Sequence, residues 1–217
     1  MTTQKRILLV HGIYSREGES NVWNMKAPLE QATGLPVVVF EYGYMHPVQA
    51  RFDNPRISRR LADVMEPGDI IVNHSNGAAV TYLATVKHGA RPSGVVMINP
   101  ALDEWRMPVC DWAHVYYNDA DEVVWWSHLL PGNVWGEMGR VGFIPQGKRP
   151  PAWTRNRMAL KDNGLTWQTS VLNTDTGISR IDAPAAKGHL AMFQSPCVQP
   201  WGKIVGGRIL TEISDAA

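Results

Sequence analysis

The sequence Asp-Ile-Ile-Val-Asn-His-Ser-Asn-Gly-Ala-Ala-Val at residues 69–80 decides the fold. Its first four residues carry an apolar run that is too short for a helix. Pro67-Gly68 precedes this run, which is typical of a strand buried on both faces of a parallel sheet. The small and apolar residues from Ala78 onward predict a helix packed closely on that sheet. A strand that turns sharply into a helix with a serine at the apex, here Ser75, has the form of a nucleophile elbow.

Ser75 lies in the pentapeptide Asn73-His-Ser-Asn-Gly77, which departs from the usual Gly-x-Ser-x-Gly pattern at its first position. Asn is larger than Gly, although it adopts unusual backbone angles more readily than most residues. Gly77 supplies the space that a tight strand-to-helix turn needs. A serine at this place could also cap an ordinary helix, and the pentapeptide alone leaves both interpretations open.

Length and composition favour one globular domain, because 217 residues with 44% hydrophobic content can bury one good-sized core. A formal net charge of +1 gives no reason to expect nucleic acid or an anionic membrane as a partner. The sequence shows no signal-peptide core and no long apolar run, so we expect no membrane span and a cytoplasmic location. Cys110 and Cys197 lack the spacing of a metal site. Buried thiols are the favoured interpretation, and a single disulfide between them is the alternative.

Strands and helices alternate along the first half of the chain. This alternation predicts a mostly parallel sheet with helices on both faces, and such sheets bind ligands outside the carboxyl ends of their strands. The predicted elements are strand 6–10, helix 20–33, strand 36–40, a helix around 57–65, strand 69–72, a helix to about 88, strands 95–98, 114–117 and 166–172, and a C-terminal helix from 198.

The loop after the first predicted strand reads His11-Gly-Ile-Tyr14. Its glycine lets the loop fold close to a site, and a backbone N–H just beyond the glycine can point at an oxyanion. The candidate donors are the N–H of Ile13 or Tyr14 and, from the elbow, the N–H of Asn76. A strand followed by His-Gly is a weak signal by itself, because many strands end in glycine.

Two acids, Asp119 and Asp121, come just after the strand predicted at 114–117. An acid at the carboxyl end of a strand is well placed to orient a histidine. Aspartate is also common in turns that have no catalytic role, so these two residues alone do not establish a site.

His189 follows Gly188 on a late loop, between the last predicted strand and the C-terminal helix. This is where a serine hydrolase of α/β architecture carries its general base. His11 and His74 are the other contenders, but both adjoin turns of the site, whose shape we expect them to support.

The alternation fails between about residues 125 and 167, where five tryptophans are mixed with glycines and prolines. We interpret this region as a loop-rich excursion that caps or walls the site, within a single domain of residues 1–217. Its tryptophans either line a substrate site or, as is more common, pack the excursion onto the rest of the domain.

Taken together, these segments resemble the α/β-hydrolase family, whose catalytic residues follow the order serine, acid, histidine. The matching parts are the oxyanion loop at 10–14, the elbow at 73–77, the acid loop at 119–124 and Gly-His at 188–189. The resemblance implies an α/β-hydrolase fold and Asp121, rather than Asp119, as the acid. It further implies that Ser75 attacks an acyl carbonyl, that His189 takes the proton, and that neither a cofactor nor a metal is needed.

We therefore expect a serine hydrolase that cleaves a small-molecule or acyl-ester substrate through an acyl-enzyme. A thioesterase, an amidase or an acyltransferase would use the same residues, and the sequence does not separate them. A catalytically silent binding module is a second possibility, motivated by Asn73. A metal-dependent hydrolase using His11, His74, Asp121 and His189 is a third, although these residues lack the spacing of metal ligands.

Overall fold

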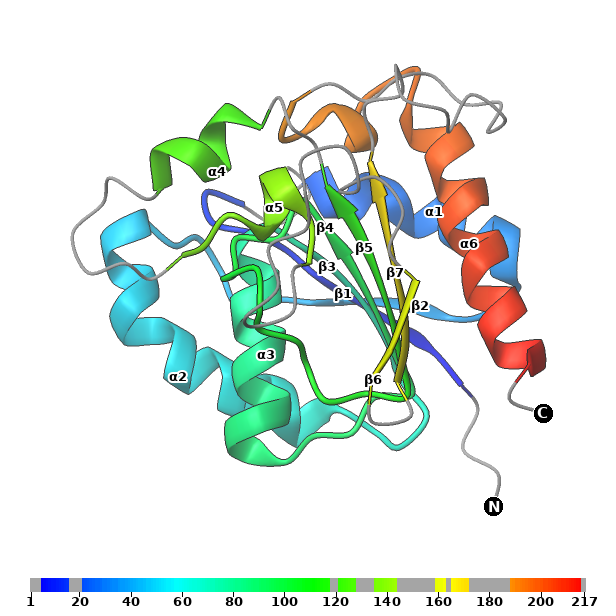
Figure 1. Ribbon diagram of the computed structural model, residues 1–217, viewed down its shortest axis with the longest axis horizontal. Coiled ribbons are helices and arrows are strands. Elements are labelled where there is room, and N and C mark those ends of the chain that lie inside the picture. Colours follow the sequence, from blue (N-terminus) through cyan, green and yellow to red (C-terminus); the bar gives the residue numbers. More distant parts are fainter. Residues whose placement is uncertain are drawn as a thin grey trace.

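The computed structural model describes residues 5–15, 21–117, 121–127, 135–143, 159–162, 165–171 and 188–215. Its strands form one seven-stranded sheet in the order β2-β1-β3-β4-β5-β7-β6, with helices on both faces (Figure 1). The mostly parallel α/β architecture predicted from the alternation of strands and helices is therefore confirmed.

Within this sheet the edge strand β6 runs antiparallel to β7, and all other described neighbours are parallel. Every residue of β1, β3, β4 and β5 is buried, which explains their continuous apolar runs. The strands are β1 Ile7–Val10, β2 Val37–Phe40, β3 Ile70–His74, β4 Gly94–Ile98, β5 Trp112–Tyr117, β6 Ala159–Asp162 and β7 Leu165–Val171.

Successive side chains of a strand point to opposite faces, so the sheet has two hydrophobic cores. On one face α2 and α3 pack against Leu8, Val10 and Ile71; on the other, α1 and α6 pack against Ile7 and Leu9 (Figure 1). The helices are α1 Lys26–Thr33, α2 Pro47–Val64, α3 Asn76–His88, α4 Glu122–Ser127, α5 Met138–Val141 and α6 Val198–Asp215, with 3-10 helices at Asn21–Met25 and Ala191–Phe193. None of the described helices is long and apolar enough to cross a membrane.

Two elements differ from the sequence-based expectation. Helix α2 begins ten residues before the stretch at 57–65 that marked it, because His46 and Gln49 form a capping box at its start. Strand β6 lies inside the region expected to be irregular, and it extends the sheet by pairing with β7. The two cysteines are buried in the cores on opposite faces of the sheet, and no disulfide joins them.

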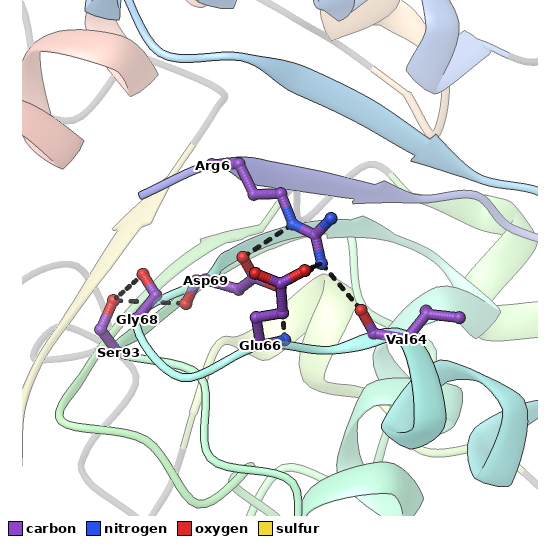
Figure 2. Close-up of polar contacts among 6 residues, drawn as sticks. All are labelled: Arg6, Val64, Glu66, Gly68, Asp69 and Ser93. Atoms are coloured by element: carbon purple, nitrogen blue, oxygen red, sulfur yellow. Dashed lines mark hydrogen bonds and ion pairs between the residues drawn. The ribbon is translucent and has the colours of Figure 1, made fainter. Parts of the chain in front are cut away.

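An ion-pair cluster joins the start of β1 to the turn before β3, at the amino end of the sheet (Figure 2). Arg6 Nε donates to Asp69 Oδ1 at 2.9 Å and Arg6 Nη2 donates to Asp69 Oδ2 at 3.1 Å, so the pair is bidentate. Arg6 Nη2 also donates to the Val64 carbonyl at 2.8 Å and lies 3.3 Å from Glu66 Oε1. This cluster fixes where the neighbouring strands β1 and β3 begin.

Removing Arg6 should destabilise the fold more than removing Asp69. The Asp69 side chain is only 2% exposed whereas that of Arg6 is 25% exposed. Arg6→Met leaves the buried Asp69 carboxylate without its cationic partner. It should lower the free energy of unfolding by about 3 kcal/mol. Asp69→Asn leaves a cation that water can reach and should cost roughly 1–2 kcal/mol.

Urea unfolding measures both losses. Arg56→Met is the matched control, because the Arg56–Asp53 pair is surface-exposed and its removal should change stability by less than about 0.5 kcal/mol. Equal losses for Arg6→Met and Arg56→Met would contradict the assigned role of the cluster.

Candidate active site

Ser75 forms the sharp turn between β3 and α3. Its backbone has φ 52° and ψ −124°, a strained conformation for a residue with a side chain. Neighbouring backbone holds it there: the Ser75 N–H donates to the Ile98 carbonyl, and the Ser75 carbonyl accepts from the N–H groups of Ala78 and Ala101. The side chain is thereby presented at the carboxyl end of the sheet, as the elbow interpretation predicted.

Asn73, at the unusual first position of the elbow, is accommodated by the helix that follows. Its side chain is fully buried, and Nδ2 donates to Thr81 Oγ1 at 3.2 Å. Thr81 Oγ1 in turn donates to the Gly77 carbonyl at 2.8 Å. The larger residue therefore connects the strand to the first turns of α3.

Two glycines allow the loops of the site to approach one another. A Cβ at Gly77 would lie 2.4 Å from the Val10 carbonyl oxygen and 2.8 Å from that of His11. A Cβ at Gly12 would lie 2.9 Å from Ser75 Cβ. The start of α3 and the His-Gly loop consequently meet at Ser75 with no room for side chains between them.

Asp121 and His189 are brought together from distant parts of the chain. His189 Nδ1 lies 2.7 Å from Asp121 Oδ2, and the two side chains are 8% and 0% exposed. Asp121 Oδ1 accepts from the Val124 N–H at 3.0 Å, which fixes the carboxylate at the start of α4. Asp119, the other acid considered, lies outside the described residues.

The loop that carries His189 is held through its backbone. The His189 carbonyl accepts from Asn99 Nδ2 at 2.9 Å and lies 3.1 Å from His74 Nε2. Asn99 itself has φ 43° just after β4. The sequence analysis missed Asn99, although a polar residue directly after a buried strand is the signal that could have revealed it.

The ring of His189 packs beside that of His74, the residue before Ser75, with centroids 4.5 Å apart. No described hydrogen bond links Ser75 Oγ directly to His189. Catalytic hydrogen bonds in unliganded enzymes are often long and tighten when substrate binds.

The backbone donors predicted from the sequence differ in their availability. The Tyr14 N–H already donates to the Met45 carbonyl at 3.1 Å, so it is not available to an oxyanion. Within the described segments, the N–H groups of Ile13 and Asn76 donate to no backbone carbonyl. Of the two alternatives on the His-Gly loop, the geometry therefore favours Ile13.

His11 and His74 are buried, which favours their neutral forms. Burial lowers the pKa of His11, and burial together with the nearby imidazole of His189 lowers the pKa of His74 well below its ordinary value of 6.5. Each contacts a carbonyl of a site loop, Gly12 for His11 and His189 for His74. Both residues shape the site, as expected from their positions.

The described residues contain no group of three or more His, Cys, Asp or Glu side chains able to hold a metal ion. The four residues considered for a metal-dependent hydrolase are thus not arranged as a ligand set: Asp121 contacts the His189 ring, whereas His74 Nε2 contacts the His189 backbone carbonyl.

Part of the tryptophan-rich excursion packs against the site. Trp135 is 3% exposed, and its Nε1 donates to Asn76 Oδ1 at 2.8 Å. The backbone at Gly136 approaches Asp103 so closely that a Cβ would lie 2.1 Å from the Asp103 Cα. Trp135 therefore packs the excursion onto the rest of the domain. That the remaining excursion forms a wall of the site stays a prediction.

The described site combines a serine elbow after β3, an acid after β5 and a histidine before α6, on a mostly parallel sheet. This is the α/β-hydrolase fold. No protein-family model and no curated protein sequence matches the chain significantly.

Two solved structures resemble the chain at low sequence identity. One, described as a YdeN-like hydrolase from Pectobacterium atrosepticum SCRI1043, is 18% identical over 67% of this chain and 86% of that chain, with a TM-score of 0.38. Another is MGS-M1, an α/β-hydrolase enzyme from a Medee basin deep-sea metagenome library. It is 14% identical over 97% of this chain and 86% of that chain, with a TM-score of 0.47.

Gly12→Ala should disable Ser75 with little effect on folding. The added methyl group would lie 2.9 Å from Ser75 Cβ, so the loop or the serine must move. A displacement of about 1 Å can lower reactivity roughly 100-fold. The rate at which a fluorophosphonate labels Ser75 measures the effect.

Gly207→Ala is the matched control for Gly12→Ala, because its Cβ would meet nothing within 4 Å. It should leave labelling nearly unchanged and raise the free energy of unfolding by about 0.5–1 kcal/mol, because alanine is more favourable than glycine inside a helix. An unaltered labelling rate in Gly12→Ala would show that the His-Gly loop does not constrain the serine.

Stability should fall as the pH drops through about 6.5. The pKa values of His11, His74 and His114 are all lowered from 6.5, chiefly by burial. Below that pH the unfolded chain binds more protons than the folded protein, so acidification favours unfolding by up to ~1.4 kcal/mol per pH unit for each histidine. Urea unfolding at pH 7.5, 6.5 and 5.5 tests this.

His114→Gln should reduce this pH dependence. Constant stability from pH 7.5 to 5.5 would mean that the buried histidines do not titrate on unfolding.

Proposed function

We propose that the protein is a serine hydrolase that cleaves carboxylic esters through Ser75, His189 and Asp121. The observation that carries the proposal is the buried 2.7 Å contact between His189 Nδ1 and Asp121 Oδ2, beside the strained serine turn. An orienting acid of this kind holds the imidazole in the tautomer whose Nε2 can accept a proton.

In the proposed reaction Ser75 Oγ attacks the carbonyl carbon of the ester while His189 Nε2 takes the hydroxyl proton. The carbonyl electron pair moves to the oxygen, and the tetrahedral intermediate then expels the alcohol, which leaves with the proton from His189. Water attacks the resulting acyl-enzyme with His189 again as base, and the carboxylic acid is released.

The negative charge of the intermediate is proposed to lie between the N–H groups of Ile13 and Asn76. Asn76 is the first residue of α3, so the helix amino terminus adds its favourable dipole. Each donor of such a pair contributes roughly 3 kcal/mol to the lowering of the barrier in comparable enzymes. The contact between Gly12 and Ser75 supports this placement, because it brings the loop with Ile13 to the serine.

A fluorophosphonate probe, with the adduct located by peptide mass spectrometry, tests the proposal first. We expect stoichiometric labelling of Ser75 and hydrolysis of short p-nitrophenyl esters, both abolished in Ser75→Ala. His189→Ala should suppress both, and Asp121→Asn should lower kcat by about 10⁴-fold because the imidazole loses its correct tautomer.

Ser58→Ala is the matched control, since Ser58 is equally buried but donates only to the Pro55 carbonyl in α2. It should retain labelling and ester hydrolysis. Folded wild-type protein that is not labelled between pH 6 and 9 would refute the serine mechanism and favour a catalytically silent binding module. Cleavage of thioesters or amides in preference to esters would correct the substrate class.

A further inference from the structure

The peptide unit that joins Gly12 to Ile13 is held by side chains which the proposed mechanism does not use. The Gly12 carbonyl lies 2.8 Å from His11 Nδ1, and it also accepts from the Tyr42 hydroxyl at 3.0 Å. The same hydroxyl lies 2.6 Å from the His11 carbonyl, so Tyr42 shares its single proton between two successive carbonyls of the loop.

A trans peptide is planar, and its C=O and N–H bonds point in opposite directions. Groups that fix the Gly12 carbonyl therefore also fix the direction of the Ile13 N–H. Donors on the carbonyl oxygen polarise the whole unit and strengthen the N–H as a donor. We propose that Tyr42 and His11 are positioning residues, which aim and polarise the Ile13 N–H as an oxyanion donor. This inference rests on the function proposed above.

The hydrogen bonds of His11 fit this positioning role. If Nδ1 carries the proton and donates to the Gly12 carbonyl, Nε2 is left to accept from the Tyr42 N–H, which lies 3.5 Å away. The two rings stack with centroids 3.8 Å apart. Burial lowers the pKa of His11 and raises that of Tyr42, which favours the neutral, hydrogen-bond-donating form of both groups.

The residue that supplies the second proposed donor is also held by side-chain hydrogen bonds. The Asn76 side chain exchanges two hydrogen bonds with Asn54 of α2, at 2.9 and 3.0 Å, and its Oδ1 also accepts from Trp135 Nε1. Both hydrogen-bonding groups of the Asn76 amide are thus used. Buried side chains therefore fix each of the two residues that supply the proposed N–H donors.

Tyr42→Phe tests the inference, because it removes only the hydroxyl that contacts the two carbonyls. We expect kcat for a p-nitrophenyl ester to fall about tenfold or more while KM stays within threefold, since the hydroxyl acts on the charged intermediate and not on the bound ester. Affinity for an aryl trifluoromethyl ketone, whose adduct with Ser75 carries an oxyanion, should fall in parallel with kcat/KM.

Tyr116→Phe is the matched control. Tyr116 is a buried tyrosine of β5 whose ring packs on Trp201, on the opposite face of the sheet from α2 and α3. This variant should keep kcat and ketone affinity within twofold, although it too loses a buried hydroxyl. Equal losses in both variants would indicate a general effect on packing and overturn the proposal.

A second measurement separates this inference from the proposed function. The ¹H–¹⁵N resonance of the Ile13 amide should move upfield in Tyr42→Phe and stay in place in Tyr116→Phe, whether or not Ser75 is reactive. If the wild-type protein fails to label but the Ile13 resonance moves, the function is refuted and the restraint on the peptide is supported. An unmoved Ile13 resonance with unchanged kcat in Tyr42→Phe would overturn the inference.

Discussion

The close approach of α3 to the end of β1 is the constraint on which the site depends. At Gly77 the helix backbone lies so near the Val10 and His11 carbonyls that no side chain fits between them. This contact determines where α3 begins, and hence where the Asn76 N–H and the Ser75 side chain lie relative to the His-Gly loop. A parallel sheet makes the arrangement possible, because β1 and β3 are neighbours whose carboxyl ends meet at one edge.

The other half of the site is assembled by hydrogen bonds to one loop. Asp121 fixes the imidazole of His189, while Asn99 and His74 contact the carbonyl of the same residue. These contacts come from the ends of β4 and β3 and from the start of α4, so three elements locate His189, which itself lies in no helix or strand. The proposed base needs this restraint, because an error of about 1 Å in its position lowers the rate strongly.

The alternation of strands and helices, the mostly parallel sheet and the elbow could be predicted because they rest on local patterns. Short apolar runs mark buried strands, and a serine between such a strand and a small-residue helix marks the turn. Strand β6 could not be predicted, since Ala-Leu-Lys-Asp at an edge has no apolar pattern to distinguish it from a loop. The pairing of Asp121 with His189 could be anticipated only through the order of residues in a known family. The roles of Tyr42, Asn54 and Trp135 depend on contacts between segments up to 59 residues apart, which no local pattern reports.

The groups around the proposed oxyanion share one electrostatic property: His11, His74, Tyr42 and Asn76 are neutral dipoles rather than charges. Buried dipoles that are already oriented stabilise a developing charge without reorganising, and in their neutral form they avoid the large desolvation penalty of a buried ion. Neutrality matters most at His74, whose ring lies 4.5 Å from that of His189. A charged His74 would repel the proton that His189 is proposed to accept, so the burial that favours neutral His74 also favours placing the imidazolium on His189, which faces Asp121.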